Sequence, residues 1–111
     1  MSDAVPVHES SGNVFADLGI EDSEGYLAKS ELAARIQAAI EARGLTQKAA
    51  GALLGISQPR VSTLLKGRLD GFSTDRLFRF LNALGVDVTI HVSMPHPRRT
   101  GRVSVVSEKR A

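Results

Sequence analysis

Residues 45–67 read LTQKAAGALLGISQPRVSTLLKG, and this stretch decides the fold. Thr46 and Ser57 each precede a segment with apolar residues at helical spacing, so each can cap a helix by accepting from a backbone N–H. Gly55 suits the position just past a helix end, where a left-handed backbone costs little without a Cβ. Gly51 in mid-helix costs roughly 1 kcal/mol against Ala and predicts close approach of the second helix's backbone. The stretch therefore predicts two short helices joined by a tight turn.

The second of these helices, about Gln58 to Lys66, divides into an apolar and a polar side at 100° per residue. The apolar side, which we expect to face the core, carries Val61, Leu64 and Leu65. The polar side and its flanks carry Gln58, Pro59, Arg60, Ser62, Thr63 and Lys66. Such a helix can present a row of polar side chains to the major groove of DNA.

The residue types of this helix fit base and phosphate contacts. A helix in the major groove reads bases mainly with its N-terminal side chains. Gln58 can pair bidentately with adenine and Arg60 with guanine, while Pro59 or Thr63 can touch a thymine methyl. Predicted phosphate contacts, which set register without reading sequence, are Gln47 at a helix N-terminus, Ser57, Lys66 and Arg68.

A purely structural hairpin of two helices is the alternative to DNA binding. Two short helices with a glycine between them are common, so the spacing alone distinguishes little. The whole combination is more specific, because it joins a Thr-Gln opening, a Gly-Ile-Ser-Gln turn, a valine three residues after that glutamine and a closing Lys-Gly. We therefore favour DNA binding.

The segment LTQ…LGISQPRVS…LKG resembles the Cro/C1-type (XRE) helix-turn-helix family. The flanking sequences GNVFADLG (12–19) and FSTDRLFRFLNALGVDV (72–88) look like the HigA-type antitoxin branch of that family. The resemblance spans about residues 12–92. It implies double-stranded operator DNA as one partner and a small basic ribonuclease toxin as another.

Two further helices are predicted around this pair. One begins near Ser23 and covers 30–43, with apolar residues at helical spacing and Gly44 at its end. The other starts at the Ser73 cap and stops at Gly85, with its Phe and Leu residues facing inward. The expected fold is mainly α, a four- to five-helix bundle with a Cro/C1-type helix-turn-helix and one C-terminal β-strand.

That strand is predicted over 86–92, where apolar residues alternate with polar ones. A lone strand is not stable by itself. It could pair with residues 102–107 as a hairpin, or with the same strand of a second subunit. We favour the second subunit, because helix-turn-helix proteins commonly bind two half-sites as two-fold dimers. A homodimer is therefore predicted.

The net charge of +2 hides an uneven distribution. Residues 1–28 contain six acidic residues and no Lys or Arg. Residues 29–93 contain nine basic and five acidic residues, and residues 94–111 contain five basic and one acidic. The basic part suits DNA phosphates. The acidic part is either a solvated arm or a segment that covers the basic groove of a ribonuclease by complementary charge.

The chain of 111 residues is expected to form one domain with flexible ends. We divide it into a partly flexible acidic leader (1–22), a DNA-binding domain with the strand (23–93) and a flexible basic tail (94–111). The tail serves solubility or adds contacts to the DNA backbone. No cysteine, signal peptide or long apolar run is evident, so we expect a cytoplasmic protein without disulfides or membrane contact.

Catalysis has little support in the sequence. His8, His91 and His96 are scattered without metal-ligand spacing. No nucleophile elbow, phosphate-binding loop or dinucleotide fingerprint is present. We therefore expect no enzyme, metal or cofactor. Two functions remain: an antitoxin that inhibits a ribonuclease by binding it and represses its own operon, or a stand-alone transcriptional repressor.

Overall fold

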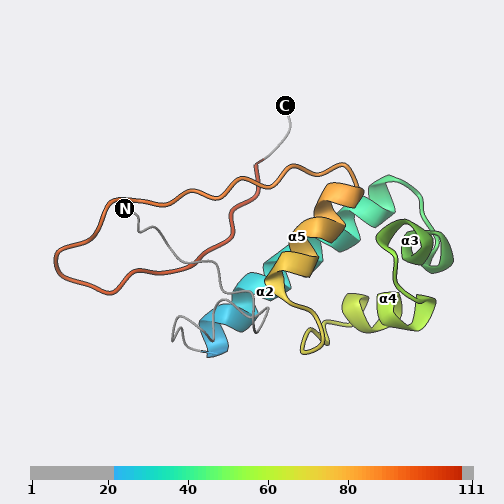
Figure 1. Cartoon of the computed structure of the whole chain (residues 1–111), viewed down its shortest axis with the longest axis horizontal. Coiled ribbons are helices and arrows are strands. Elements are labelled where there is room, and N and C mark those ends of the chain that lie inside the picture. The colour runs from blue at the N-terminus through green and yellow to red at the C-terminus, as the bar shows by residue number, and fades with distance from the viewer. Residues whose placement is uncertain (1–21, 109–111) are drawn as a thin grey trace.

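The computed structural model describes residues 22–108, which contain four helices (Figure 1). These are α2 (Asp22–Ala42), α3 (Gln47–Leu54), α4 (Gln58–Leu65) and α5 (Thr74–Ala83). The helices α2 and α5 lie side by side and run in the same direction, while α3 and α4 pack together beside this pair, on its right in Figure 1. The mainly helical fold and the positions of all four predicted helices are confirmed.

The three shorter helices begin at hydroxyl caps. The Oγ1 of Thr46 accepts from the backbone N of Ala49 at 3.0 Å. The Oγ of Ser57 accepts from Arg60 N at 3.3 Å, and the Oγ of Ser73 from Arg76 N at 3.2 Å. Each cap satisfies one of the backbone donors that a helix start leaves without an intrahelical partner. Capping chemistry therefore sets the helix starts that the sequence predicted.

Two glycines set the angle between α3 and α4. Gly55 follows α3 with a left-handed backbone of φ 76°. A Cβ on Gly51 would lie 2.7 Å from the carbonyl oxygen of Ile56 and 3.4 Å from the Cγ2 of Val61. From α4 there is also the backbone N of Gln58, at 3.6 Å. The backbone of the second helix therefore does lie near Gly51, as predicted, but the backbone of the turn comes closer.

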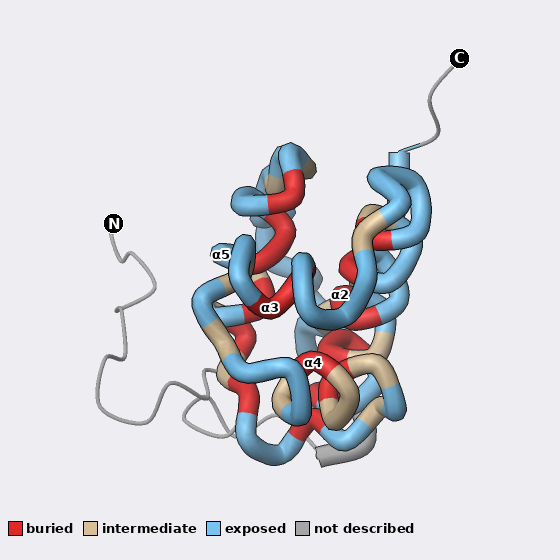
Figure 2. Tube along the Cα trace, turned by 90° about the vertical axis from the view of Figure 1, so that its right-hand side faces the viewer, coloured by how far each residue is buried: buried red, intermediate tan, exposed pale blue. Residues whose placement is uncertain are grey.

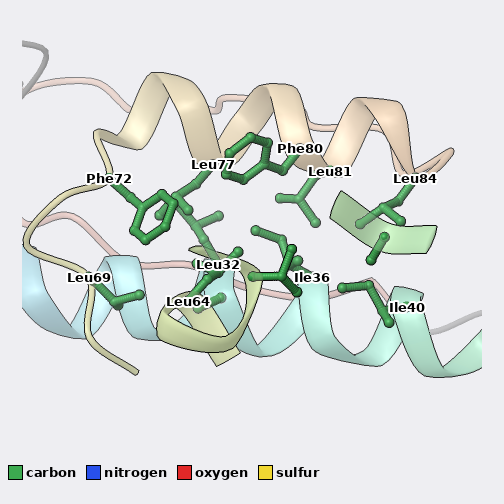
Figure 3. Close-up of a cluster of buried hydrophobic side chains, with 13 residues drawn as sticks. Leu32, Ile36, Ile40, Leu64, Leu69, Phe72, Leu77, Phe80, Leu81 and Leu84 are labelled. Atoms are coloured by element: carbon green, nitrogen blue, oxygen red, sulfur yellow. The ribbon is translucent and has the colours of Figure 1, made fainter. Parts of the chain in front are cut away.

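The hydrophobic core lies where all four helices meet (Figure 3). Leu32, Ile36 and Ile40 of α2 face Leu77, Leu81 and other residues of α5. The apolar side of α4 packs against the same core, and the loop between α4 and α5 adds Leu69 and Phe72. Figure 2 shows this buried interior enclosed by exposed outer turns. The remaining side chains of the buried cluster are Ala33, Ala50, Val61, Leu64, Phe80 and Leu84.

The strand predicted over 86–92 is not formed in the described chain. No residue from 86 to 108 is assigned to a strand, so neither the strand nor its hairpin with 102–107 is confirmed. Val86 and Val88 pack against the core, but Ile90 and Val92 are 69% and 76% exposed. The segment runs out beyond α5 and turns back (Figure 1). Its outer half lacks the neighbouring strand that a ladder requires. Pairing with a second subunit stays a prediction.

Several predictions concern residues outside the described part of the chain. The acidic leader (1–22) lies outside residues 22–108 except for Asp22. The predicted division into leader, domain and tail stays a prediction. Within residues 22–108, no helix combines the length and the apolar character that a membrane crossing requires.

Candidate nucleic-acid interface

One side of α4 is buried and the other faces outward. Val61 and Leu64 are fully buried against the other helices. Gln58 and Pro59, at the N-terminal end of the helix, are exposed, as is Lys66 just after its last turn. Both α3 and α4 lie toward the viewer in Figure 2, at the outer end of the bundle. The helix is therefore anchored by its inner side and offers a polar outer side.

Ser62 and Thr63 lie in the middle of α4 and are half-buried. The hydroxyl of Thr63 donates to the backbone carbonyl of Pro59 at 3.0 Å, one turn earlier. This bond occupies the hydroxyl hydrogen, so Thr63 is better suited to an apolar contact, such as a thymine methyl, than to donating to a base.

The starts of α3 and α4 place polar groups near their N-terminal backbone donors. Gln47 is the first residue of α3 and is exposed. Ser57 is also exposed, and its hydroxyl oxygen accepts from α4's backbone. Its hydroxyl hydrogen can still donate to an anionic oxygen. Backbone N–H groups at a helix start favour a phosphate there.

Three cations lie exposed on or beside the two helices. They are Lys48 on α3, and Lys66 and Arg68 after α4. Within residues 22–108 none of the three forms an ion pair; the described pair joins Arg35 to Glu31 on α2 at 3.1 Å. Cations without carboxylate partners remain available for phosphate contacts, and Lys48 is a candidate that the sequence reasoning missed.

Arg60 differs from the other predicted site residues. Its guanidinium carbon lies 4.2 Å from the ring centroid of Phe72, and its Nη2 donates to the carbonyl of Gly71 at 3.1 Å. The side chain therefore lies along the loop between α4 and α5, and it is half-buried. The helical period alone placed Arg60 on a flank. It could not show that an aromatic ring from the loop would lie beside that flank.

Residues 22–108 contain no group of three or more His, Cys, Asp or Glu side chains that could hold a metal ion. His96 contacts Arg99, with His96 Nε2 2.6 Å from Arg99 Nη2, in the exposed segment beyond the helices.

Residues 46–66 define a helix-turn-helix unit, because they contain two capped helices, the glycine turn between them and the buried inner side of α4. Comparisons with known proteins agree. Residues 14–93 match the model of a helix-turn-helix domain family. A solved structure provisionally named an XRE-family transcriptional regulator is 44% identical in sequence, with a TM-score of 0.72, and the match covers 79% of this chain and 100% of that one. No curated protein matches the chain.

The chain therefore belongs to the XRE family of helix-turn-helix regulators, whose members bind DNA. This confirms the resemblance to the XRE family and the DNA-binding class that the sequence predicted, while the HigA-type branch stays a prediction. The eight residues predicted for the DNA-binding site remain a proposal: Gln47, Ser57, Gln58, Pro59, Arg60, Ser62, Thr63 and Lys66.

Proposed function

We propose that the protein is a sequence-specific repressor whose helix α4 enters the major groove of its operator. The observation that most directly supports this proposal is the division of α4 into two sides. Val61 and Leu64 are fully buried, while the N-terminal side chains of Gln58 and Pro59 are exposed. A recognition helix needs this arrangement, because it must be held rigidly while its N-terminal side chains reach the base edges.

The proposed contacts divide by chemistry. Gln58 reads adenine through its amide, and Pro59 and Thr63 supply apolar contacts for a thymine methyl. Gln47, Ser57, Ser62 and Lys66 contact the phosphate backbone or nearby polar edges of the groove. Arg60 also belongs to the predicted site, but its side chain lies along the loop between α4 and α5.

Two substitutions test this division of roles. Gln58→Ala is expected to weaken operator binding by roughly 1–3 kcal/mol and to relax preference at one base pair. Lys66→Ala is expected to weaken binding to all sequences alike and to lower the slope of log affinity against log salt by about 0.9. Binding titrations at several salt concentrations measure the affinity and the salt slope of each variant. In vitro selection with each variant measures its base preference.

The matched control is Gln37→Ala, which removes an exposed glutamine on α2. It should leave operator affinity and base preference unchanged. If Gln58→Ala behaved like this control, α4 would not be the recognition helix.

We propose further that the protein binds its operator as a homodimer. Ile90, Val92 and Met94 are 69%, 76% and 81% exposed and stand at alternate positions of one extended segment. A second copy of the same segment could cover these side chains and complete the strand ladder that residues 22–108 of one chain do not form. A two-fold dimer would then present two α4 helices to half-sites one helical turn apart.

The finer proposal is an antitoxin that also represses its own operon. It is supported by the resemblance to the HigA-type branch and by the charge pattern, with six acidic residues and no Lys or Arg in residues 1–28. A ribonuclease needs a basic groove for its substrate, and an acidic segment can cover such a groove by complementary charge. A stand-alone repressor without a toxin partner is the alternative, since both functions would use the same α4 surface.

Purification of the tagged full-length protein from its native host at moderate salt separates the two functions. A stoichiometric small basic protein that degrades RNA once freed would support the antitoxin proposal. Recovery of the protein alone, as a dimer that still binds its own promoter, would favour the stand-alone repressor. Deleting residues 1–19 should then abolish toxin neutralisation; intact neutralisation would contradict the role given to the acidic leader.

A further inference from the structure

Two arginines and two phenylalanines form a continuous set of contacts between α4 and α5. Arg60 of α4 covers the ring of Phe72, with 4.2 Å from the guanidinium carbon to the ring centroid. The Phe72 and Phe80 rings meet edge to face, with centroids 6.0 Å apart and planes at 73°. The guanidinium of Arg76 lies 5.6 Å from the Phe80 centroid. Such cation–aromatic and edge-to-face contacts are attractive at these separations.

These contacts fix Arg60 to a rigid part of the molecule. Phe72 and Phe80 are 1% and 4% exposed, so the ring that supports the guanidinium is itself held in the core (Figure 3). The Nη2 of Arg60 also donates to the carbonyl of Gly71 at 3.1 Å. The planar guanidinium can stack and donate at the same time, which a lysine ammonium cannot do equally well.

Gly71 gives the guanidinium its space. A Cβ on Gly71 would lie 3.0 Å from Nη1 of Arg60 and 3.9 Å from both the guanidinium carbon and Nη2. The guanidinium of Arg60 therefore lies next to Gly71, with Nη1 nearest to it, while it covers the ring of Phe72. The contact with Phe72 and the hydrogen bond to Gly71 hold the Arg60 side chain along the loop, at the flank of α4. The missing Cβ of Gly71 leaves the room that this position requires.

We propose that Arg60 is a positioning residue for the recognition helix and does not discriminate between bases. It joins the N-terminal half of α4 to the loop before α5, and so fixes the orientation in which Gln58 and its neighbours reach the groove. This inference rests on the proposed function of α4 and changes the role expected for Arg60 from the sequence, which was to pair with guanine.

The three possible roles of Arg60 predict different effects on binding. Loss of a base reader relaxes preference at one base pair. Loss of a phosphate contact weakens all sequences alike and lowers the salt slope by about 0.9. Loss of a positioning residue weakens the operator much more than random DNA, because every base contact made by α4 depends on its orientation.

The test compares Arg60→Ala with the wild-type full-length protein. The operator is obtained by in vitro selection with the wild type, and binding is titrated against this duplex and a scrambled one. Circular dichroism confirms that the variant is folded at the temperature used. We expect operator affinity to fall roughly tenfold, with little change on scrambled DNA, and preference to weaken evenly over all base pairs that α4 reads.

Gly71→Ala perturbs the same contact without removing a charge or any side chain of α4. The added methyl must displace the guanidinium, because the end of this long side chain moves more easily than the backbone. We expect the same pattern with a smaller loss, about threefold. In the Arg60→Ala background the glycine substitution should have no further effect, because the displaced group is already gone.

Arg79→Ala is the matched control, since it removes an exposed arginine of α5 that has no described contact. It should leave operator preference unchanged. Loss of preference at a single base pair in Arg60→Ala, an equal loss on both duplexes, or a lower melting temperature with unchanged affinities would each overturn the proposal. If selection with the wild type enriched no sequence, the proposed function itself would fail, and the role of Arg60 with it.

Discussion

The helical body and the segment after it both contain regularly spaced apolar residues, at helical spacing in the first and in alternation in the second, with opposite outcomes. In the body (25–85), Leu77 is fully buried and Leu81 is 2% exposed. In the segment 86–108, Ile90 and Val92 are 69% and 76% exposed. The body buries its apolar stripes because each helix finds another within the same chain. The outer part of the segment finds no such partner, so regular spacing alone does not produce burial.

The largest expected effect on the free energy of unfolding comes from a substitution in the core of the helical body. Leu77→Ala removes a fully buried side chain and should lower the free energy of unfolding by roughly 2–5 kcal/mol. Leu53→Ala makes the same chemical change at a helical position that is 40% exposed, and should cost less than about 1 kcal/mol. Urea denaturation of both variants gives the two values. Equal losses would contradict the packing described for the body.

A smaller effect is expected at the contact between α3 and the turn. Gly51→Ala improves helix preference by about 1 kcal/mol, but the added Cβ would lie 2.7 Å from the carbonyl oxygen of Ile56. Because overpacking costs roughly 1–3 kcal/mol, we expect a net loss of up to about 2 kcal/mol. Gly101→Ala, where nothing lies within 4 Å of the new Cβ, is the control and should be nearly neutral. A stabilised Gly51→Ala protein in thermal unfolding would show that the turn can move away.

The smallest effect on stability is expected in the extended segment. Val92→Lys changes a side chain that is 76% exposed, so the free energy of unfolding of the single chain should shift by less than about 0.5 kcal/mol. Its oligomeric state should nevertheless change from dimer to monomer in light scattering, because a lysine cannot pack in the proposed intersubunit sheet. Ser93→Lys, at the neighbouring position of the alternation, should remain dimeric. A Val92→Lys protein that remained dimeric would contradict the proposed intersubunit sheet.

The sequence predicted the helices because their signals are local. Thr46, Ser57 and Ser73 each bring a cap, and helical apolar spacing follows each of them. The inner side of α4 could be predicted for the same reason. The position of Arg60 could not, because it depends on Phe72, which lies twelve residues further along the chain, in a loop. The strand predicted over 86–92 is not confirmed within residues 22–108, because a strand needs a partner that its own sequence does not specify.

The division of α4 into an anchored and an open side has a consequence for how such regulators diverge. The side chains of Gln58 and Pro59 are exposed and form no described hydrogen bond with the rest of the protein. Substitutions at these two positions can therefore accumulate with little loss of stability. A duplicated copy of the gene could acquire a new operator at these positions while it keeps Val61, Leu64 and the Arg60–Phe72 contact. Folding and target choice would then evolve on separate sets of residues within a single eight-residue helix.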